Sequence, residues 1–363
     1  MIKKSGVYYA QTENVIESEG LLWFTDMWSG DLLTYNLQND KAALIWKCND
    51  AGHRIFGSIS KWDNKIIMVP FVYDKIIIYD IKTGSHRNIE IAKSPYNRLI
   101  GWGCSASSLS SHIYENSLYI TPSLYPGIIE INLVTENMII YNLPGSNDSN
   151  LKQSEEGEVA FFRSSFLFEN KIYMPCCRDN SMYIFDLKNK AFIDKKLGNE
   201  RYRFSAVIKH QGFVWVAPRK GSVVLKWKEN EDFVEEIPIK SDEFISARMV
   251  IYGGEIRLIS VDGKEFYYDS DLQIFSPAES VDKFYALNNS TKEIYSNNMG
   301  EIRHIDEKGI NHTIKICLPD EELVKILNAE SVIEKAVKEN RFGIVVLEND
   351  SDTIDRFLTY LCG

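Results

Sequence analysis

Short segments in which apolar and polar residues alternate recur along the whole chain. Each follows a turn residue, and several end in a proline or a polar residue. Strict alternation over four to eight residues predicts a half-buried β-strand. Seven segments share the pattern: GLLWFTD (20–26), NKIIMVP (64–70), NSLYITP (116–122), NKIYMPC (170–176), GFVWVAP (212–218), GEIRLIS (254–260) and KEIYSNN (292–298). Their fourth residues are 38 to 54 positions apart, a spacing that indicates a repeat protein.

Each repeat contains three further segments in a constant order. Upstream lies a segment that begins with small residues and closes on an aromatic residue or a histidine. Downstream lies a second arm that ends in a turn such as YDIKTG, where the Asp or Asn side chain can bond its own backbone two residues on. A fourth strand follows. The upstream segments are FGSISKW (56–62), SLSSHIY (108–114), FRSSFLF (162–168), FSAVIKH (204–210) and SARMVIY (246–252).

Four short strands per unit in seven units predict an all-β fold, a seven-bladed β-propeller of four-stranded antiparallel blades. The upstream strand is expected to be the innermost strand of each blade, because its small residues fit where seven blades crowd around the central channel. A two-sheet sandwich is the alternative, but it would not explain the constant register of the copies. The predicted propeller spans residues 1–318, with blades near 12–49, 56–92, 108–143, 162–198, 204–240, 246–276 and 284–316.

The paired pattern of KIYMPC followed by MYIFDL, repeated over roughly residues 12–316, resembles kelch-type propeller repeats. The double glycine of kelch units occurs here once, as Gly253–Gly254, and the tryptophans are irregularly placed. The resemblance therefore implies the fold and carries no specific function.

The two ends of the chain differ from the repeats. Residues 319–363 predict a helix, a strand (342–349) and a second helix (351–361), a small α/β tail that is too short to fold alone. The tail can be a packing cap, or an appendage that binds a partner or docks the chain into a larger complex. Residues 5–11 could add a strand to the last blade and close the ring.

Composition narrows the class of protein. The net charge of −10 argues against a general nucleic-acid binder or a polybasic membrane binder, which rely on a positive field. No window reaches the roughly 18 consecutive apolar residues of a membrane span, and the N-terminus has no apolar signal-peptide core. Six scattered cysteines without framework spacing favour free thiols and a cytoplasmic location.

The adjacent pair Cys176–Cys177 lies in the predicted connection between the second and third strands of blade four. No histidine or second cysteine pair stands at metal-ligand spacing, so no metal site and no cofactor are expected. Thiol chemistry is the alternative to the simpler interpretation, in which both cysteines are small buried apolar residues.

In a propeller, the loops between second and third strands and the loops between blades share one face around the channel mouth. Blades one to three place aromatic residues there, with Arg98 beside them, and blades four to six place arginines. Arginine pairs with carboxylate or phosphate, and aromatic rings stack on sugars and other planar groups. The predicted ligand-binding residues are Trp28, Tyr73, Arg98, Trp102, Tyr125, Arg163, Arg178, Arg203 and Arg219.

This mixture predicts a non-catalytic recognition or scaffolding propeller. It would bind, at the channel mouth, either another protein or a small anionic ligand that stacks in part on aromatic rings, such as an acidic glycan. Under the alternative, each arginine pairs with a neighbouring acid, for example Asp179, Glu158, Glu200 or Glu243.

Enzyme signatures such as G-x-S-x-G, H-E-x-x-H, a Walker loop or a Rossmann fingerprint do not occur in the sequence. His53, the one histidine in a predicted mouth loop, is the candidate base of a lyase or hydrolase that acts on an acidic sugar or a small anionic substrate. His112 and His210 fall on predicted inner strands, where histidines with satisfied hydrogen bonds are the commoner case.

Overall fold

The computed structural model describes part of the chain. The described residues are 8–9, 12, 15–26, 29–48, 56–71, 73–91, 108, 110–146, 160–241, 244–252, 254–260, 264–278, 285–286, 293–296, 301–305, 311–315 and 317–318. The predicted tail, 319–363, lies outside them.

From β2 to β25 the described strands make six antiparallel sheets of four strands, each in simple chain order. Each sheet is called a blade here. Blade one is β2 (Val15–Ser18), β3 (Leu21–Thr25), β4 (Leu32–Asn36) and β5 (Lys41–Trp46). Blade two is β6 (Phe56–Trp62), β7 (Lys65–Pro70), β8 (Lys75–Asp80) and β9 (His86–Glu90). Blade three is β10 (Ser111–Tyr114), β11 (Ser117–Ile120), β12 (Gly127–Asn132) and β13 (Met138–Asn142).

The next three blades repeat this order. Blade four is β14 (Phe166–Phe168), β15 (Lys171–Pro175), β16 (Ser181–Asp186) and β17 (Ala191–Lys196). Blade five is β18 (Phe204–His210), β19 (Phe213–Pro218), β20 (Val223–Trp227) and β21 (Val234–Pro238). Blade six is β22 (Ser246–Tyr252), β23 (Glu255–Ser260), β24 (Glu265–Asp269) and β25 (Ile274–Pro277). A further sheet has the same order: β26 (Tyr285–Ala286), β27 (Glu293–Ser296), β28 (Glu301–Ile305) and β29 (Asn311–Lys315).

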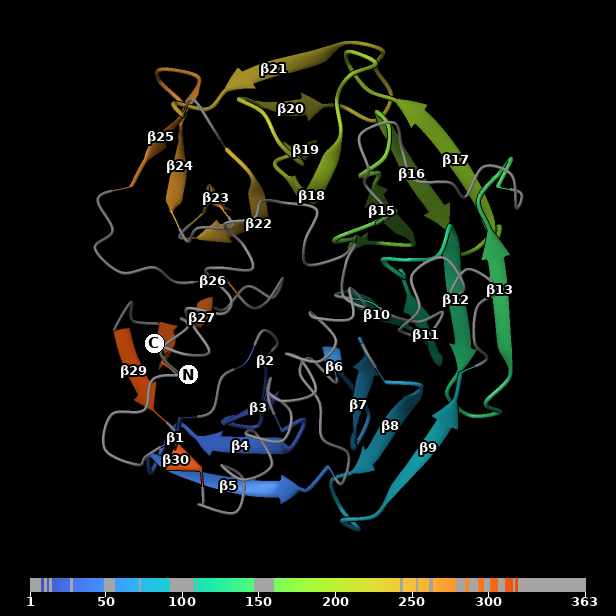
Figure 1. Ribbon diagram of the computed structural model, residues 1–363, viewed down its shortest axis with the longest axis vertical. Coiled ribbons are helices and arrows are strands. Elements are labelled where there is room, and N and C mark those ends of the chain that lie inside the picture. The colour runs from blue at the N-terminus through green and yellow to red at the C-terminus, as the bar shows by residue number, and fades with distance from the viewer. Residues whose placement is uncertain are drawn as a thin grey trace, which may run out of the picture.

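The blades stand radially around a common axis, with the first strand of each nearest the centre and the fourth at the periphery (Figure 1). This arrangement is a β-propeller. Strands β6, β18 and β22 span the residues predicted for innermost strands. β10 and β14 start later than predicted, because the residues before them contact the preceding blade. Examples are the bonds from Ser108 N to Pro70 O (3.2 Å) and from Phe161 N to Ser123 O (2.7 Å).

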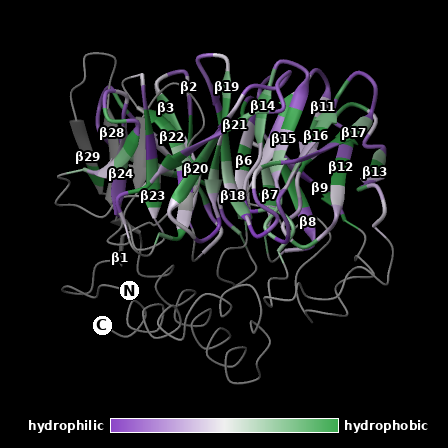
Figure 2. Ribbon diagram, turned by 90° about the horizontal axis from the view of Figure 1, so that it is seen from above, coloured by the Kyte–Doolittle hydropathy of each residue, from purple (hydrophilic) through white to green (hydrophobic). Residues whose placement is uncertain are grey.

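The turns between third and fourth strands close as predicted. In five blades an Asp or Asn Oδ1 accepts the backbone N–H two residues later, at 2.8 to 3.0 Å. The five residues are Asn36, Asp80, Asn132, Asp186 and Asp269. These turns lie on one face of the ring, the turn face, where hydrophilic residues predominate (the upper rim in Figure 2).

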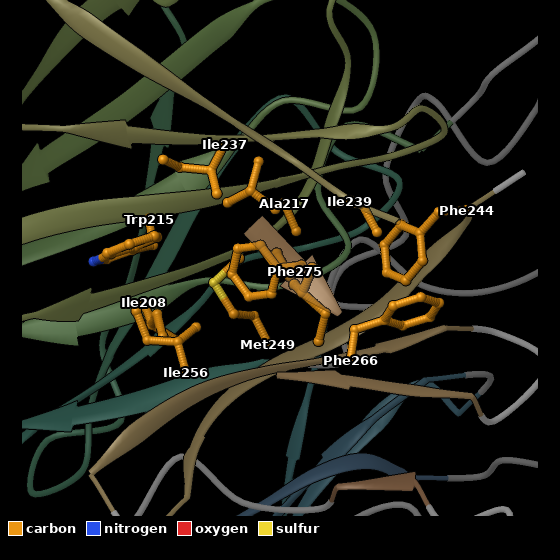
Figure 3. Packing of buried hydrophobic residues seen from close by; sticks show 13 residues of the cluster. Ile208, Trp215, Ala217, Ile237, Ile239, Phe244, Met249, Ile256, Phe266 and Phe275 are labelled. Atoms are coloured by element: carbon orange, nitrogen blue, oxygen red, sulfur yellow. The ribbon is translucent and has the colours of Figure 1, made fainter. Parts of the chain in front are cut away.

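The apolar core lies between blades, because each sheet buries both of its faces. Between blades five and six, Trp215 and Ile237 meet Met249 and Phe275 (Figure 3). The ring of Trp215 also lies edge-on to that of Tyr268, with centroids 4.8 Å apart. Aromatic contacts of this kind add about 1 kcal/mol to the area that they bury.

A buried ionic cluster joins blades three and four near the turn face. The Glu130 carboxylate accepts hydrogen bonds from Tyr119 (2.7 Å), Tyr141 (2.9 Å), Ser117 (2.9 Å) and the Lys190 ammonium (2.8 Å). Burial alone would raise the pKa of Glu130, but these hydrogen bonds together hold it below its ordinary value. Burial and the same carboxylate raise the pKa of Tyr141 to about 12.

The N-terminal segment pairs with the far end of the described chain. β1 (Tyr8–Tyr9) runs antiparallel to β30 (Cys317–Leu318), directly after β29. The two strands form a sheet of their own. The sequence suggested instead a further strand on the last blade, but that sheet already has four strands.

Candidate ligand-binding site

One face of the ring gathers the loops between second and third strands and the segments that lead into the next blade. We call it the loop face. Backbone hydrogen bonds join these two kinds of segment from one blade to the next. They run from Phe161 N to Ser123 O (2.7 Å), from Phe204 N to Cys176 O (2.8 Å) and from Gly221 N to Phe244 O (3.0 Å). Side chains from successive blades are therefore held at fixed positions on this face.

Four of the predicted arginines lie in connections on this face, on blades four and five. Arg163 precedes β14, Arg178 lies in the β15–β16 loop, Arg203 precedes β18 and Arg219 follows β19. Arg219 N donates to Arg203 O at 2.6 Å, and Cys177 N, next to Arg178, donates to Phe161 O at 2.9 Å. We call these four residues the arginine cluster.

Arg178 is held by an aromatic ring. The centre of its guanidinium lies 4.4 Å from the centroid of Phe161, a cation–π contact. The neighbouring Asp179 is bound by Lys196 at 3.0 Å and by Ser181 N at 2.9 Å. Burial would raise the pKa of Asp179, but bonds from Ser181 and Lys196 hold it below its ordinary value. Asp179 is thus a carboxylate at neutral pH, and it is paired with a lysine.

The other arginines are also constrained. One terminal nitrogen of Arg203 donates to the backbone carbonyls of Glu200 and Tyr202, both at 2.8 Å. Arg219 is 5% exposed and Arg163 is half-buried. Held guanidinium groups lose less conformational freedom when they bind an anion than free surface arginines do.

The predicted aromatic residues are less accessible than expected. Tyr125 is buried, and its hydroxyl donates to Asn142 Oδ1. Tyr73 is half-buried, with its ring edge-on to Phe56 at 5.9 Å and the Lys75 ammonium 5.9 Å from its centroid. Trp28, Arg98, Trp102 and the candidate base His53 lie outside the described residues.

A hydroxyl network that sequence reasoning did not identify surrounds the inner strands. Ser58 Oγ lies 2.8 Å from Ser111 Oγ, which joins blades two and three. Ser165 Oγ lies 2.8 Å from His112 Nε2 and 2.7 Å from Thr121 Oγ1, which joins blades three and four. Burial lowers the pKa of His112 to about 4, so its ring is neutral at pH 7. The serine runs 107–108, 110–111 and 164–165 were the available signal.

Cys176 and Cys177 form no disulfide, are buried and lie in the β15–β16 loop, as the sequence predicted. Burial, with a smaller effect of Asp179, raises the pKa of the Cys176 thiol well above its ordinary value. Such a thiol is a poor nucleophile. Across the described ranges, no group of three His, Cys, Asp or Glu side chains is arranged to hold a metal ion. No helix in the same ranges is long and apolar enough to cross a membrane.

No protein-family model and no curated protein matches the chain. Solved structures do resemble it. Virginiamycin B lyase from Staphylococcus aureus aligns with a TM-score of 0.63 at 10% identity, over 81% of this chain and 94% of the lyase. BamB from Moraxella catarrhalis aligns with 0.54 at 11% identity, over 86% and 92%. The Cps50 (Swd1) propeller domain of Myceliophteria thermophila aligns with 0.55 at 7% identity, over 88% and 100%. At these identities the similarity shows the β-propeller fold alone.

Proposed function

We propose that this protein is a non-catalytic recognition propeller that binds an anionic ligand at the arginine cluster on its loop face. The ligand class is a carboxylate or phosphate carried by a sugar or a similar ring, such as an acidic glycan. The observation that supports the proposal is that all four residues of the arginine cluster lie in connections on the same face of two adjacent blades.

The chemistry of arginine supports an anion as the ligand. The guanidinium stays charged at all physiological pH values and presents parallel N–H donors that match carboxylate and phosphate oxygens. In a chain of net charge −10, four arginines in the connections of one face depart from the average charge of the protein. The Phe161 ring beneath Arg178 orients one of these donors.

Three further features belong to this proposal. The sheet β26–β29 has the strand order of the other blades and would be the seventh blade of the ring. The pairing of β1 with β30 would close that ring. Cys48, Cys176 and Cys177 form no disulfide, which favours the cytoplasm as the compartment.

A thermal-shift screen tests the proposal. The library contains acidic sugars, phosphorylated metabolites and short acidic peptides. A ligand that raises the Tm of the wild type should bind the double variant Arg178→Gln/Arg219→Lys at least about 10-fold more weakly, because the loss of even one charge-assisted hydrogen bond costs about 1.5 to 3 kcal/mol. Arg87→Gln, which removes an arginine paired with Glu136 at the periphery, should leave affinity unchanged.

Equal affinity of the wild type and the double variant would remove the arginine cluster as the site. The same screen distinguishes this proposal from the alternative of a lyase or hydrolase with His53 as its base. It requires that a binding compound is consumed and that His53→Ala abolishes its consumption.

A further inference from the structure

The fourth strands of the blades form the periphery of the ring, and each leaves one edge without a neighbouring strand in the described sheets (Figure 1). Exposed edges promote pairing with other chains, and proteins commonly protect them with charged residues, prolines or bulges. Most outer strands here carry such protection. It consists of Lys41 in β5, Arg87 in β9, Lys195 in β17, Glu235 in β21, Pro277 in β25 and Lys315 in β29.

β13 differs from the other outer strands in the described part of the chain. Its sequence, MIIYN, contains neither a charged residue nor a proline. Ile139 is 50% exposed and Ile140 is 41% exposed, and Val134 in the preceding turn is 64% exposed. Three of the eight large apolar residues that are exposed among the described residues thus lie in this one hairpin arm.

The direction of the backbone groups of β13 follows from its pairing with β12. Leu143 N donates to Pro126 O, and Asn137 O accepts from Asn132 N, both at 2.9 Å. Residues 137 and 143 therefore turn their backbone groups toward β12. Because this direction alternates along a strand, residues 139 and 141 do the same, and Met138, Ile140 and Asn142 direct N–H and C=O toward the free edge.

We propose that β13 pairs antiparallel with β13 of a second copy of this chain, with Ile140 opposite Ile140 on a two-fold axis. In this register Met138 lies opposite Asn142, and Ile139 lies opposite Tyr141. Met138, Ile140 and Asn142, whose backbone groups point outward, then pair with Asn142, Ile140 and Met138 of the second copy. These are the three hydrogen-bonded pairs of the interface. The two blades join into one eight-stranded sheet, a closed two-fold interface.

Charge favours a second copy as the occupant. The register places Glu136 opposite Pro144 and Asn137 opposite Leu143, so no like charges meet. Self-pairing of β21 about its centre would instead place Glu236 opposite Glu236, which is unfavourable. The interface lies on the outer rim, so the arginine cluster would remain accessible in both copies.

The test is the oligomeric state of the full chain by sedimentation velocity over a range of concentrations. The wild type should dimerise, and Ile140→Pro should be monomeric. Proline at position 140 removes an N–H that points away from β12, so the hydrogen bonds between β12 and β13 are retained and the blade can still fold. A melting curve would verify this. Asn88→Pro is the matched control. Ile91 N donates inward to Asp74 O (3.0 Å), so by the same alternation the N–H of residue 88 in β9 points outward. Asn88→Pro removes this outward N–H and should leave the dimer intact.

A cross-linking experiment tests the register. Residues in a hydrogen-bonded antiparallel pair have Cα atoms about 5.5 Å apart, within disulfide reach. Ile140→Cys should form a covalent dimer on mild oxidation. Leu272→Cys, at a 69% exposed site on blade six, should not exceed the wild-type background. A monomeric wild type, a dimer that survives Ile140→Pro, or equal cross-linking at both positions would overturn the proposal.

Discussion

His112 Nε2 on β10 lies 2.8 Å from Ser165 Oγ, the residue before β14, and so links blades three and four beside the centre of the ring. The burial that makes this contact possible also lowers the pKa of His112 to about 4, from an ordinary value of 6.5. The unfolded chain therefore binds a proton on this ring between about pH 6.5 and 4, and the folded chain does not.

The first prediction is that the protein becomes less stable as the pH is lowered through this window. Because the unfolded state binds more protons, the free energy of unfolding should fall as pH decreases from about 6.5 to 4, by up to about 1.4 kcal/mol per pH unit from this group. Urea denaturation of wild type and His112→Gln at several pH values measures it. The variant should show a shallower dependence than the wild type. Parallel curves for the two proteins would refute the assignment.

A second prediction concerns the buried carboxylate between blades three and four. Glu130→Gln leaves the Lys190 ammonium without its counter-charge and should lower the free energy of unfolding by about 2 kcal/mol. Glu136→Gln breaks an exposed pair with Arg87 and should cost about 0.5 kcal/mol. The pKa of Glu130 is lowered in the folded state, so its stabilisation is present above the ordinary value of 4.5 and is lost as pH falls below it. Chemical denaturation at neutral pH and near pH 4 separates the two variants.

The third prediction rests on a close approach between blades two and three. A Cβ on Gly57, at the bulge of β6, would lie 2.1 Å from the backbone oxygen of Ser108. Gly57→Ala should therefore force the blades apart and cost about 2 kcal/mol or more. Gly212→Ala meets no atom within 4 Å and should cost only the strain of its φ of +82°, about 1 kcal/mol. Thermal unfolding that ranks Gly212→Ala as the more harmful change would show that the blades do not meet at Gly57.

The fourth prediction is that the adjacent cysteines are chemically inert in the folded protein. Cys176 and Cys177 are 3% and 1% exposed, and burial raises the pKa of Cys176. A maleimide reagent should modify them only after denaturation, as mass spectrometry of the labelled peptides would show. Cys176→Ala should retain ligand binding. Rapid labelling of Cys176 in the native protein would favour the alternative of thiol chemistry.

The sequence predicted those parts of the fold that depend on local patterns. The bounds of β6, β18 and β22 followed from alternation and from small residues at the strand start, and the turns at Asp80 and Asp186 followed from Asx chemistry. Contacts between blades could not be predicted in this way, because the partners are about 50 residues apart in the chain, as His112 and Ser165 are.

The candidate site was predictable to a similar extent. Loop position placed Arg178 and Arg219 on one face, because blades repeat their connections. Burial of Tyr125 was not predictable, since it depends on the partner of its hydroxyl, Asn142, on another strand. The same type of residue in a loop can therefore be a binding residue or a core residue, and its neighbours in the fold decide which.

The most direct measurement is a crystal structure of the wild type with the strongest ligand from the thermal-shift screen. We expect the anionic group to lie on the loop face, within hydrogen-bond distance of Arg178 and of at least one of Arg163, Arg203 and Arg219. A ligand bound on the turn face, or on the loop face without contact to any of these four guanidinium groups, would contradict it.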